Sequence, residues 1–173
     1  MIVLLPPSET KRAGGEGPPL RLEALSFPEL NPVRAELADE LVALAADAPA
    51  CRKALGISAS QDHEIERNLA LFESPTLPAI TRYTGVLYDA LDVESLRGAA
   101  VSRARARLAV GSALFGLLRA GDPIPAYRLS ASSKLPGKGT LAARWRPALE
   151  AVLIEIAKEE LVVDLRSGSY AAL

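Results

Sequence analysis

Two short apolar runs near opposite ends of the chain constrain its fold most. Residues 2–5 form a continuous, β-favouring run closed by Pro6 and Pro7, and residues 161–165 form a second run of this kind. Each predicts a buried strand. Because the sequence between them is dominated by helical patterns, we expect an α/β or α+β fold, a helix-rich single domain around a small sheet. At 173 residues, 49% of them hydrophobic, the chain can bury one core and needs no second domain.

The spacing of apolar residues predicts where the intervening elements lie. Residues 32–46 carry apolar positions three and four apart, which is typical of an amphipathic helix. Residues 13–19 have no periodicity, and we expect them to be mobile. Further helices are predicted over residues 50–55, 61–71, 77–91, 113–118 and 141–157, with a strand over residues 108–111.

Charge and cysteine content indicate which partners and which cellular compartment suit this chain. The formal net charge is −1, so the chain has no overall field that attracts nucleic acid, and anion binding must come from local clusters of basic residues. The single cysteine, Cys51, rules out an intramolecular disulfide and suits a reducing compartment. The first apolar run is too short for a signal peptide, and no run approaches the roughly 18 residues of a membrane span. We therefore expect a cytoplasmic protein that does not contact a membrane.

Several classes of active site are absent from the sequence. One histidine, His63, and one cysteine cannot supply the ligand cluster that zinc or iron requires, so we expect no metal and no cofactor. The sequence has no Gly-x-Ser-x-Gly elbow, no Walker loop and no G-x-G-x-x-G fingerprint. Hydrolytic triad chemistry and nucleotide binding through these motifs are therefore not expected.

The most informative polar cluster follows the apolar residues 113–118. Arg119, Asp122, Tyr127 and Arg128 surround a turn rich in proline and glycine. Guanidinium groups present paired donors that match phosphate or carboxylate oxygens, so the cluster predicts an anion site. The alternative is structural: Arg119 would cap the preceding helix, where the dipole favours a cation, and pair with Asp122.

Two other groups of polar residues have open interpretations. Ser8, Thr10 and Lys11 follow the first predicted strand, at the end where open α/β sheets place ligand-binding loops; the alternative is a solvated turn. Four arginines lie within eleven residues near the middle of the chain. If the segment is extended, the three arginines nearest its C-terminal end lie on one face; if it is helical, they are distributed around the helix surface. They are Arg97, Arg103, Arg105 and Arg107.

Five segments, taken in order, resemble the YaaA family of bacterial peroxide-stress proteins. They are residues 4–11 (LLPPSETK), 83–88 (YTGVLY), 111–129 (GSALFGLLRAGDPIPAYRL), the lone Trp145 and 162–170 (VVDLRSGSY). The resemblance covers the whole chain and implies a YaaA-like domain that binds DNA and limits oxidative damage. It also implies a helix-hairpin-helix element over residues 50–71, which would bind DNA phosphates near Lys53. Many family members have Pro-Ala-Lys-Thr near the start, where this chain has Glu9 at the lysine position and Lys11 two residues later.

The chain departs from the family pattern at several positions. Phe115 stands where the family has tyrosine, Ala120 where it has proline, and Asp164 where it has asparagine. Family chains also continue past Tyr170, so we expect this chain to be truncated at its C-terminal end relative to the family. Strand edges near residues 162–165 would then be unpaired, which favours oligomers that form through them.

The sequence allows three functional hypotheses. The first is sequence-independent binding of double-stranded DNA in a basic cleft, with Tyr88 and Tyr127 shaping its wall; the cations are Lys11, Lys53, Arg119, Arg128 and Lys134. The second is an enzyme acting on a small anionic, nucleotide-like substrate, with catalytic candidates Ser8, Lys11, Asp122, Tyr127 and Ser167. The third is a partner-binding domain whose arginines hold loops together. A deep pocket with a perturbed lysine pKa favours the enzyme, and an open groove rimmed by arginines favours DNA.

Overall fold

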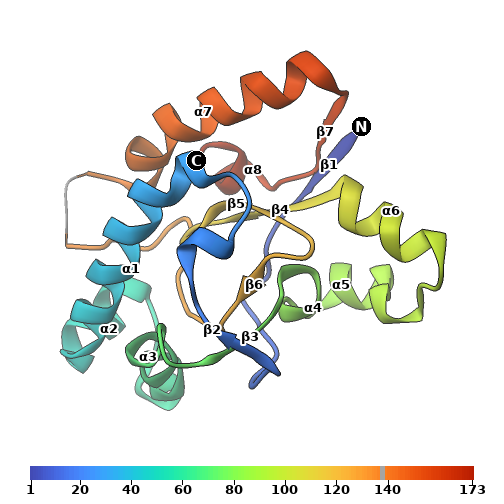
Figure 1. Ribbon diagram of the computed structural model, residues 1–173. Helices are drawn as coiled ribbons and strands as arrows, with labels where there is room; N and C mark the ends of the chain where they lie inside the picture. Colours follow the sequence, from blue (N-terminus) through green and yellow to red (C-terminus); the bar gives the residue numbers. More distant parts are fainter. Residues whose placement is uncertain (137–138) are drawn as a thin grey trace.

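The central sheet joins strands from widely separated parts of the sequence. The computed structural model describes residues 1–136 and 139–173 (Figure 1). The strands lie in the order β5-β4-β1-β7, with β1 parallel to both of its neighbours and β4 antiparallel to β5. Their bounds are Ile2–Leu5 for β1, Leu108–Ser112 for β4, Gly116–Arg119 for β5 and Val162–Asp164 for β7. The strands expected at residues 2–5, 108–111 and 161–165 are therefore confirmed.

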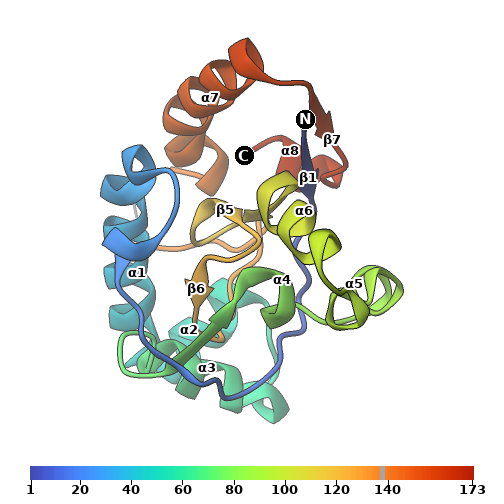
Figure 2. The same ribbon diagram turned by 45° about the vertical axis from the view of Figure 1, so that its right-hand side comes forward.

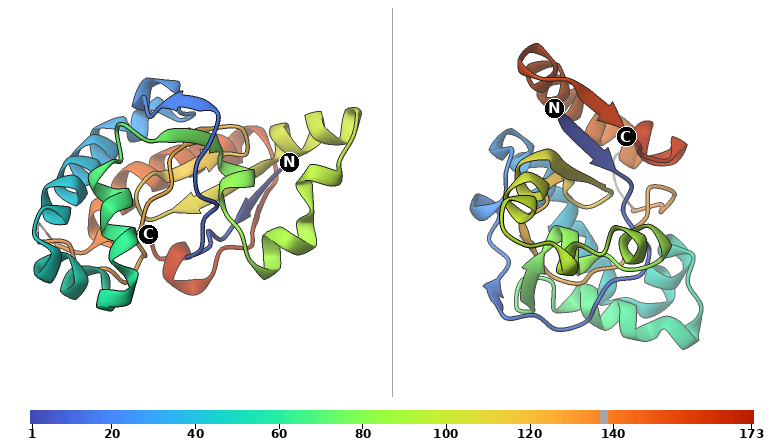
Figure 3. Two further views of the ribbon diagram at one scale, coloured as in Figure 1. Left: turned by 90° about the horizontal axis from the view of Figure 1, so that it is seen from below. Right: turned by 90° about the vertical axis from the view of Figure 1, so that its right-hand side faces the viewer.

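Helices make up most of the remaining described structure, so the expected helix-rich α/β class is confirmed. α1 packs against α2, α3 and α7, and α7 also contacts β5. Figures 1 and 2 agree that α7 lies at one end of the molecule and α3 at the other, and Figure 3 shows β1 and β7 side by side. The longer helices are α1 Asn31–Ala45, α2 Ala48–Leu55, α3 Asp62–Leu69, α6 Ala99–Arg107 and α7 Leu141–Glu159; α8 is the short Gly168–Ala171. Within the described ranges, no helix is long and apolar enough to cross a membrane.

A second, smaller antiparallel sheet corrects two predictions. Its order is β2-β3-β6, with bounds Gly17–Pro19, Pro75–Pro78 and Pro123–Ile124. Part of the segment without periodicity is thus strand β2, because its small glycines allow the backbone to lie directly against Thr76. The helix predicted over residues 77–91 is wrong: β3 is followed by α4 (Ala79–Arg82) and α5 (Val86–Leu91). Gly85, at φ +102°, lies in the break between these two helices.

The helix predicted over residues 113–118 is also wrong. Residues 113–115 form a turn, and Gly116–Arg119 returns as β5 beside β4, with Ser112 opposite Gly116. Gly116 has a φ of +72°, and the Trp145 ring lies so close that a Cβ there would be 2.7 Å from its Cζ3 atom. Because the whole run is buried, its apolar residues fit a buried strand as well as a helix, and periodicity alone does not separate the two.

Two arginines are buried in the core, where they bind backbone carbonyls. Arg34 donates to the carbonyls of Phe115 and Leu117 at 2.9 and 2.7 Å, which supports the β4–β5 hairpin from α1. Arg82 donates to the carbonyls of Ile124 and Gly14 at 3.1 and 2.8 Å. Burial lowers the pKa of each to about 10. Both arginines hold loops in place, and neither was singled out from the sequence.

Candidate functional site

Three basic residues from distant parts of the sequence line one surface hollow of about 440 Å³. Lys53 comes from α2, and Arg128 and Lys134 come from the loop that follows β6. We call this site the cationic hollow. Its other polar lining is Glu9, Ser130 and Ser132, and its remaining lining is Ala54, Leu55 and Gly56. The structure thus brings together three of the five cations predicted for anion binding.

Specific hydrogen bonds hold the walls of the cationic hollow. The Asn68 side chain accepts from the Arg128 backbone N–H at 2.8 Å and donates to its carbonyl at 2.9 Å, as a neighbouring strand would. The Ser130 N–H donates to Ser133 Oγ at 3.1 Å, and the Lys134 N–H donates to the Ala54 carbonyl at 2.9 Å. The loop that carries Arg128 and Lys134 is therefore attached to both α3 and α2.

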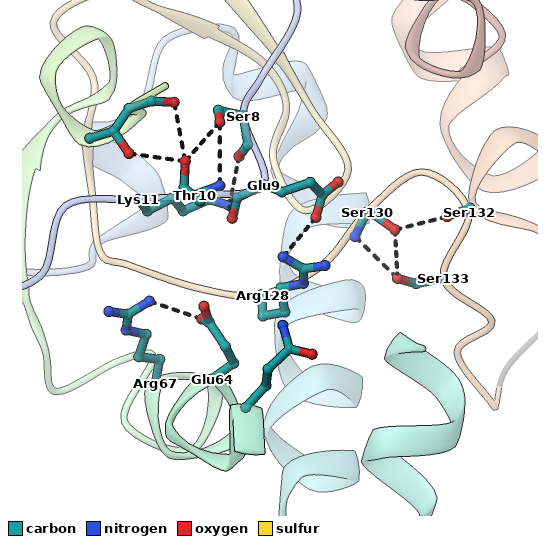
Figure 4. A network of polar contacts seen from close by, with 12 residues as sticks. Ser8, Glu9, Thr10, Lys11, Glu64, Arg67, Arg128, Ser130, Ser132 and Ser133 are labelled. Carbon is teal, nitrogen blue, oxygen red and sulfur yellow. Dashed lines mark hydrogen bonds and ion pairs between the residues drawn. The ribbon is translucent and has the colours of Figure 1, made fainter. Parts of the chain in front are cut away.

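One anionic side chain already occupies part of the hollow. Arg128 Nη1 lies 3.0 Å from Glu9 Oε2, and the Arg128 side chain is 18% exposed while that of Glu9 is 46% exposed (Figure 4). Lys53 and Lys134 are exposed. An incoming anion would compete with Glu9 for Arg128 and would meet the two lysines directly.

Lys11 lies buried behind Glu9, at the carboxyl end of β1. Its side-chain amine donates to the carbonyls of Ser8 at 3.1 Å and Glu9 at 3.4 Å, and packs 4.3 Å from the centre of the Tyr127 ring. Burial lowers the pKa of Lys11 to about 8, against the opposing attraction of Glu9 and Glu64. Close to neutral pH, part of the population therefore carries a neutral amine here, which can accept a proton.

A chain of hydroxyl groups lies beneath Lys11. Tyr83 and Tyr127 share a hydrogen bond of 2.8 Å between their hydroxyls, and Tyr127 shares a second, also 2.8 Å, with Ser112. Burial raises the pKa of Tyr83 to about 12 and that of Tyr127 well above its ordinary value. The phenols are therefore neutral at physiological pH, and they supply Lys11 with aromatic faces rather than with a counter-charge.

The structure places the other predicted residues elsewhere. Arg119 ends β5, so the preceding helix that it was expected to cap does not exist; its side chain instead donates at 2.9 Å to the carbonyl of Ala106, in the last turn of α6. Asp122 accepts from the Ser26 hydroxyl at 2.7 Å and from the Arg119 N–H at 3.0 Å, and burial raises the pKa of its carboxyl. These contacts anchor a turn, and neither Arg119 nor Asp122 lines the cationic hollow.

Three more candidates occupy separate positions. Tyr88 donates to the Pro6 carbonyl at 2.8 Å and lines a different, smaller hollow. Ser8 lies beside Lys11, where its hydroxyl bonds with that of Thr10 at 3.2 Å (Figure 4). Ser167 is exposed and precedes α8. Of these three, Ser8 contacts Lys11 directly, because its carbonyl accepts a hydrogen bond from the Lys11 amine.

Residues 50–71 form two helices with a tight turn between them. Gly56 adopts a left-handed conformation at the end of α2, with φ +65°, and lines the cationic hollow. Ser58 and Gln61 form a capping box ahead of α3. Arg52 Nε donates to Asp62 Oδ1 at 2.7 Å, which ties the two helices together. The turn thus brings α2 and its Lys53 to the rim of the hollow.

Most of the remaining basic cluster is helical, because Arg97 lies before α6 and the other three arginines lie on it. Arg103, Arg105 and Arg107 lie on α6, so their side chains spread around the helix rather than forming one stripe. Among the residues that the structure describes, no group of three or more His, Cys, Asp or Glu side chains gathers where it could hold a metal ion.

Sequence reasoning missed several residues that shape the hollow. Nothing in the local sequence pointed to Asn68, because its partner Arg128 lies 60 residues away along the chain. Ser130 and Ser132 did have a signal: a run of serines directly after Arg128 is rich in hydroxyl groups that can bind anions. Glu9 was noted only as a departure from the family pattern.

The fold and the hollow define a helix-rich α/β protein with basic side chains gathered beside a buried lysine. The sequence profile of the family described as "Peroxide stress protein YaaA" matches residues 1–173. A UPF0246 protein of Corynebacterium glutamicum is 50% identical over 100% of this chain and 69% of its own length. A UPF0246 protein of Streptomyces coelicolor is 49% identical over 99% of this chain and 66% of its own, and an uncharacterized protein of Campylobacter jejuni is 28% identical over 98% and 69%. The chain belongs to the YaaA family of peroxide stress proteins.

Proposed function

We propose that this peroxide-stress protein binds the phosphate backbone of DNA, without sequence preference, through the cationic hollow. The single observation that carries the proposal is the convergence of Lys53, Arg128 and Lys134 on one hollow, although the chain as a whole has a net charge of −1. Local clustering of this kind is what an anion site requires in a nearly neutral protein.

The surroundings of the three cations suit phosphate oxygens. The hydroxyl groups of Ser130 and Ser132 add neutral donors beside the charges. The Glu9 carboxylate pairs with Arg128, and a backbone phosphate of DNA would replace it with another singly charged anion. Binding therefore exchanges one ion pair for another, and the two lysines supply the net attraction.

A salt series tests this proposal. Fluorescence anisotropy of a labelled duplex would be recorded from low to high salt for the wild type and for the Lys53→Ala/Lys134→Ala double variant. Two lost phosphate contacts should make the slope of log K against log salt shallower by about 2. The matched control is Arg103→Ala/Arg105→Ala, which removes two exposed cations from α6 and should leave the slope almost unchanged. Equal slopes for the wild type and the lysine variant would refute the proposal.

A second candidate function is an enzyme acting on a small anionic, nucleotide-like substrate. The observation that favours it is Lys11, whose pKa of about 8 suits a general base and which lies behind Glu9 at the rim of the hollow. The test incubates the protein with nucleoside monophosphates and diphosphates and follows them by phosphorus NMR. Turnover that rises with pH towards 8 and is lost in Lys11→Met would support the enzyme. Unchanged substrates, or equal turnover in the variant, would exclude this role for Lys11.

A further inference from the structure

A second hollow adjoins the cationic hollow across α2. It has a volume of about 400 Å³, and Lys53, Ala54 and Lys134 line both hollows. The lining found only in the second hollow is apolar: Leu44, Ala50 and Pro136. An apolar space therefore lies directly beside a space with three cations. The volume falls within the range of small-molecule sites.

The boundary between the two hollows is held by hydrogen bonds. The Lys134 N–H donates to the Ala54 carbonyl at 2.9 Å, which attaches the loop to α2 at the shared wall. At the other end of α2, the Ala50 N–H donates to Asp47 Oδ1 at 3.0 Å, a helix cap that fixes the first turn of α2, which carries Ala50. Both hollows thus share a wall in which the loop that follows β6 is attached to α2.

A nucleotide has the same arrangement as the two hollows, with an anionic group beside an apolar one. Its phosphate is anionic, its sugar carries oxygen acceptors, and its base presents a flat apolar face one sugar away from the phosphate. In a duplex both faces of a base are stacked and its edge is paired, whereas in a single strand the base is free to pack against a protein. Apolar side chains as well as aromatic ones line pockets that hold unpaired bases.

We propose that the apolar hollow is a base subsite, and that the ligand of the paired hollows is a single-stranded or unpaired nucleotide with its phosphate in the cationic hollow. This inference rests on the proposed nucleic-acid binding and names its substrate class. A fatty anion would also bring charge and an apolar body together. The nucleotide is favoured because the hydroxyl groups of Ser130 and Ser132 complement sugar and phosphate oxygens, which an acyl chain lacks.

The test compares three labelled DNAs of equal length: a single strand, the same strand with abasic sites, and a duplex. The wild type should bind the single strand about tenfold more tightly than the abasic strand, because each base held against the protein adds to affinity. Ala50→Leu fills the apolar hollow without adding charge, and it should reduce binding of the single strand to that of the abasic strand. The matched control Ala157→Leu adds the same side chain to an exposed position on α7 and should keep the full difference.

The possible outcomes separate this inference from the function on which it rests. Equal affinity of the wild type for the single strand and the abasic strand overturns the base subsite, and this comparison needs no variant. If that binding still weakens with salt and with Lys53→Ala/Lys134→Ala, phosphate capture stands alone. If no DNA binds, both proposals fail. Binding of oleate in place of DNA, abolished by Ala50→Leu, would assign the hollows to an amphiphile and also overturn the inference.

Discussion

Lys11 illustrates how strongly one buried residue depends on its surroundings. The side chain is 8% exposed and faces two tyrosine rings and two carbonyls. None of these groups carries a full negative charge, so the ammonium loses more hydration than it regains. The fold therefore favours the neutral amine, relative to an exposed lysine.

This preference predicts a pH dependence of stability. The folded pKa of Lys11 is about 8, below the ordinary 10.5. Between these values the unfolded chain retains a proton that the folded chain has released, so the free energy of unfolding rises with pH. From pH 7 to pH 10 the gain is about 2 to 3 kcal/mol at most. Urea denaturation of the wild type and Lys11→Met should show the rise only in the wild type. Parallel pH profiles would mean that the amine is not desolvated as described.

Glu9 is the residue whose removal should strengthen anion binding. Its carboxylate pairs with Arg128 and competes with any phosphate that enters the cationic hollow. Glu9→Gln removes the competing charge and should raise affinity for DNA roughly two- to fivefold, which is the scale of one partly exposed ion pair. Anisotropy at fixed salt measures the change. Glu73→Gln, at an exposed position outside the hollow, serves as the control, and an equal increase in that variant would point to a general charge effect instead.

At the scale of elements, the β4–β5 hairpin depends on one glycine. Gly116 has a positive φ and lies against the Trp145 ring. A side chain there meets both backbone strain and a large, fully buried neighbour. Gly116→Ala should lower the free energy of unfolding by about 2 kcal/mol or more.

The control for this prediction is the other glycine near the end of the hairpin. Gly121 is exposed, and a Cβ there meets nothing within 4 Å. Gly121→Ala should therefore change stability by less than about 1 kcal/mol, as measured by urea denaturation. A similar loss in both variants would contradict the role of the Trp145 contact.

The elements that were predicted correctly are those whose pattern is local. α1 and α7 have long amphipathic repeats, and β1 has an apolar run closed by two prolines, so each is recognisable from its own residues. The run over residues 113–118 is apolar throughout and has no preferred face, so its structure is decided by pairing with β4 and by packing against Trp145. The cationic hollow follows the same rule: Lys53, Arg128 and Lys134 were recognisable by charge, but their convergence depends on the contact of Asn68 with Arg128.

At the scale of the whole molecule, the single tryptophan reports on global unfolding. Trp145 is fully buried, and its indole N–H donates to the Ala113 carbonyl at 2.8 Å, so α7 and the hairpin are joined at its ring. Fluorescence of Trp145 and helical circular dichroism should give the same urea midpoint, because loss of this contact opens the core that the helices share. A fluorescence transition at lower urea would instead identify α7 as a separately unfolding unit.

The position of β1 has a consequence for how the chain reaches this structure. β1 leaves the ribosome well before either of its neighbours in the sheet, because β4 follows about a hundred residues later and β7 lies near residue 163. Its backbone partners do not exist during most of synthesis, and parallel pairing over such separations forms slowly. Until those strands are translated, Ile2–Leu5 is an apolar segment without its backbone partners, and exposed segments of this kind promote aggregation before folding is complete.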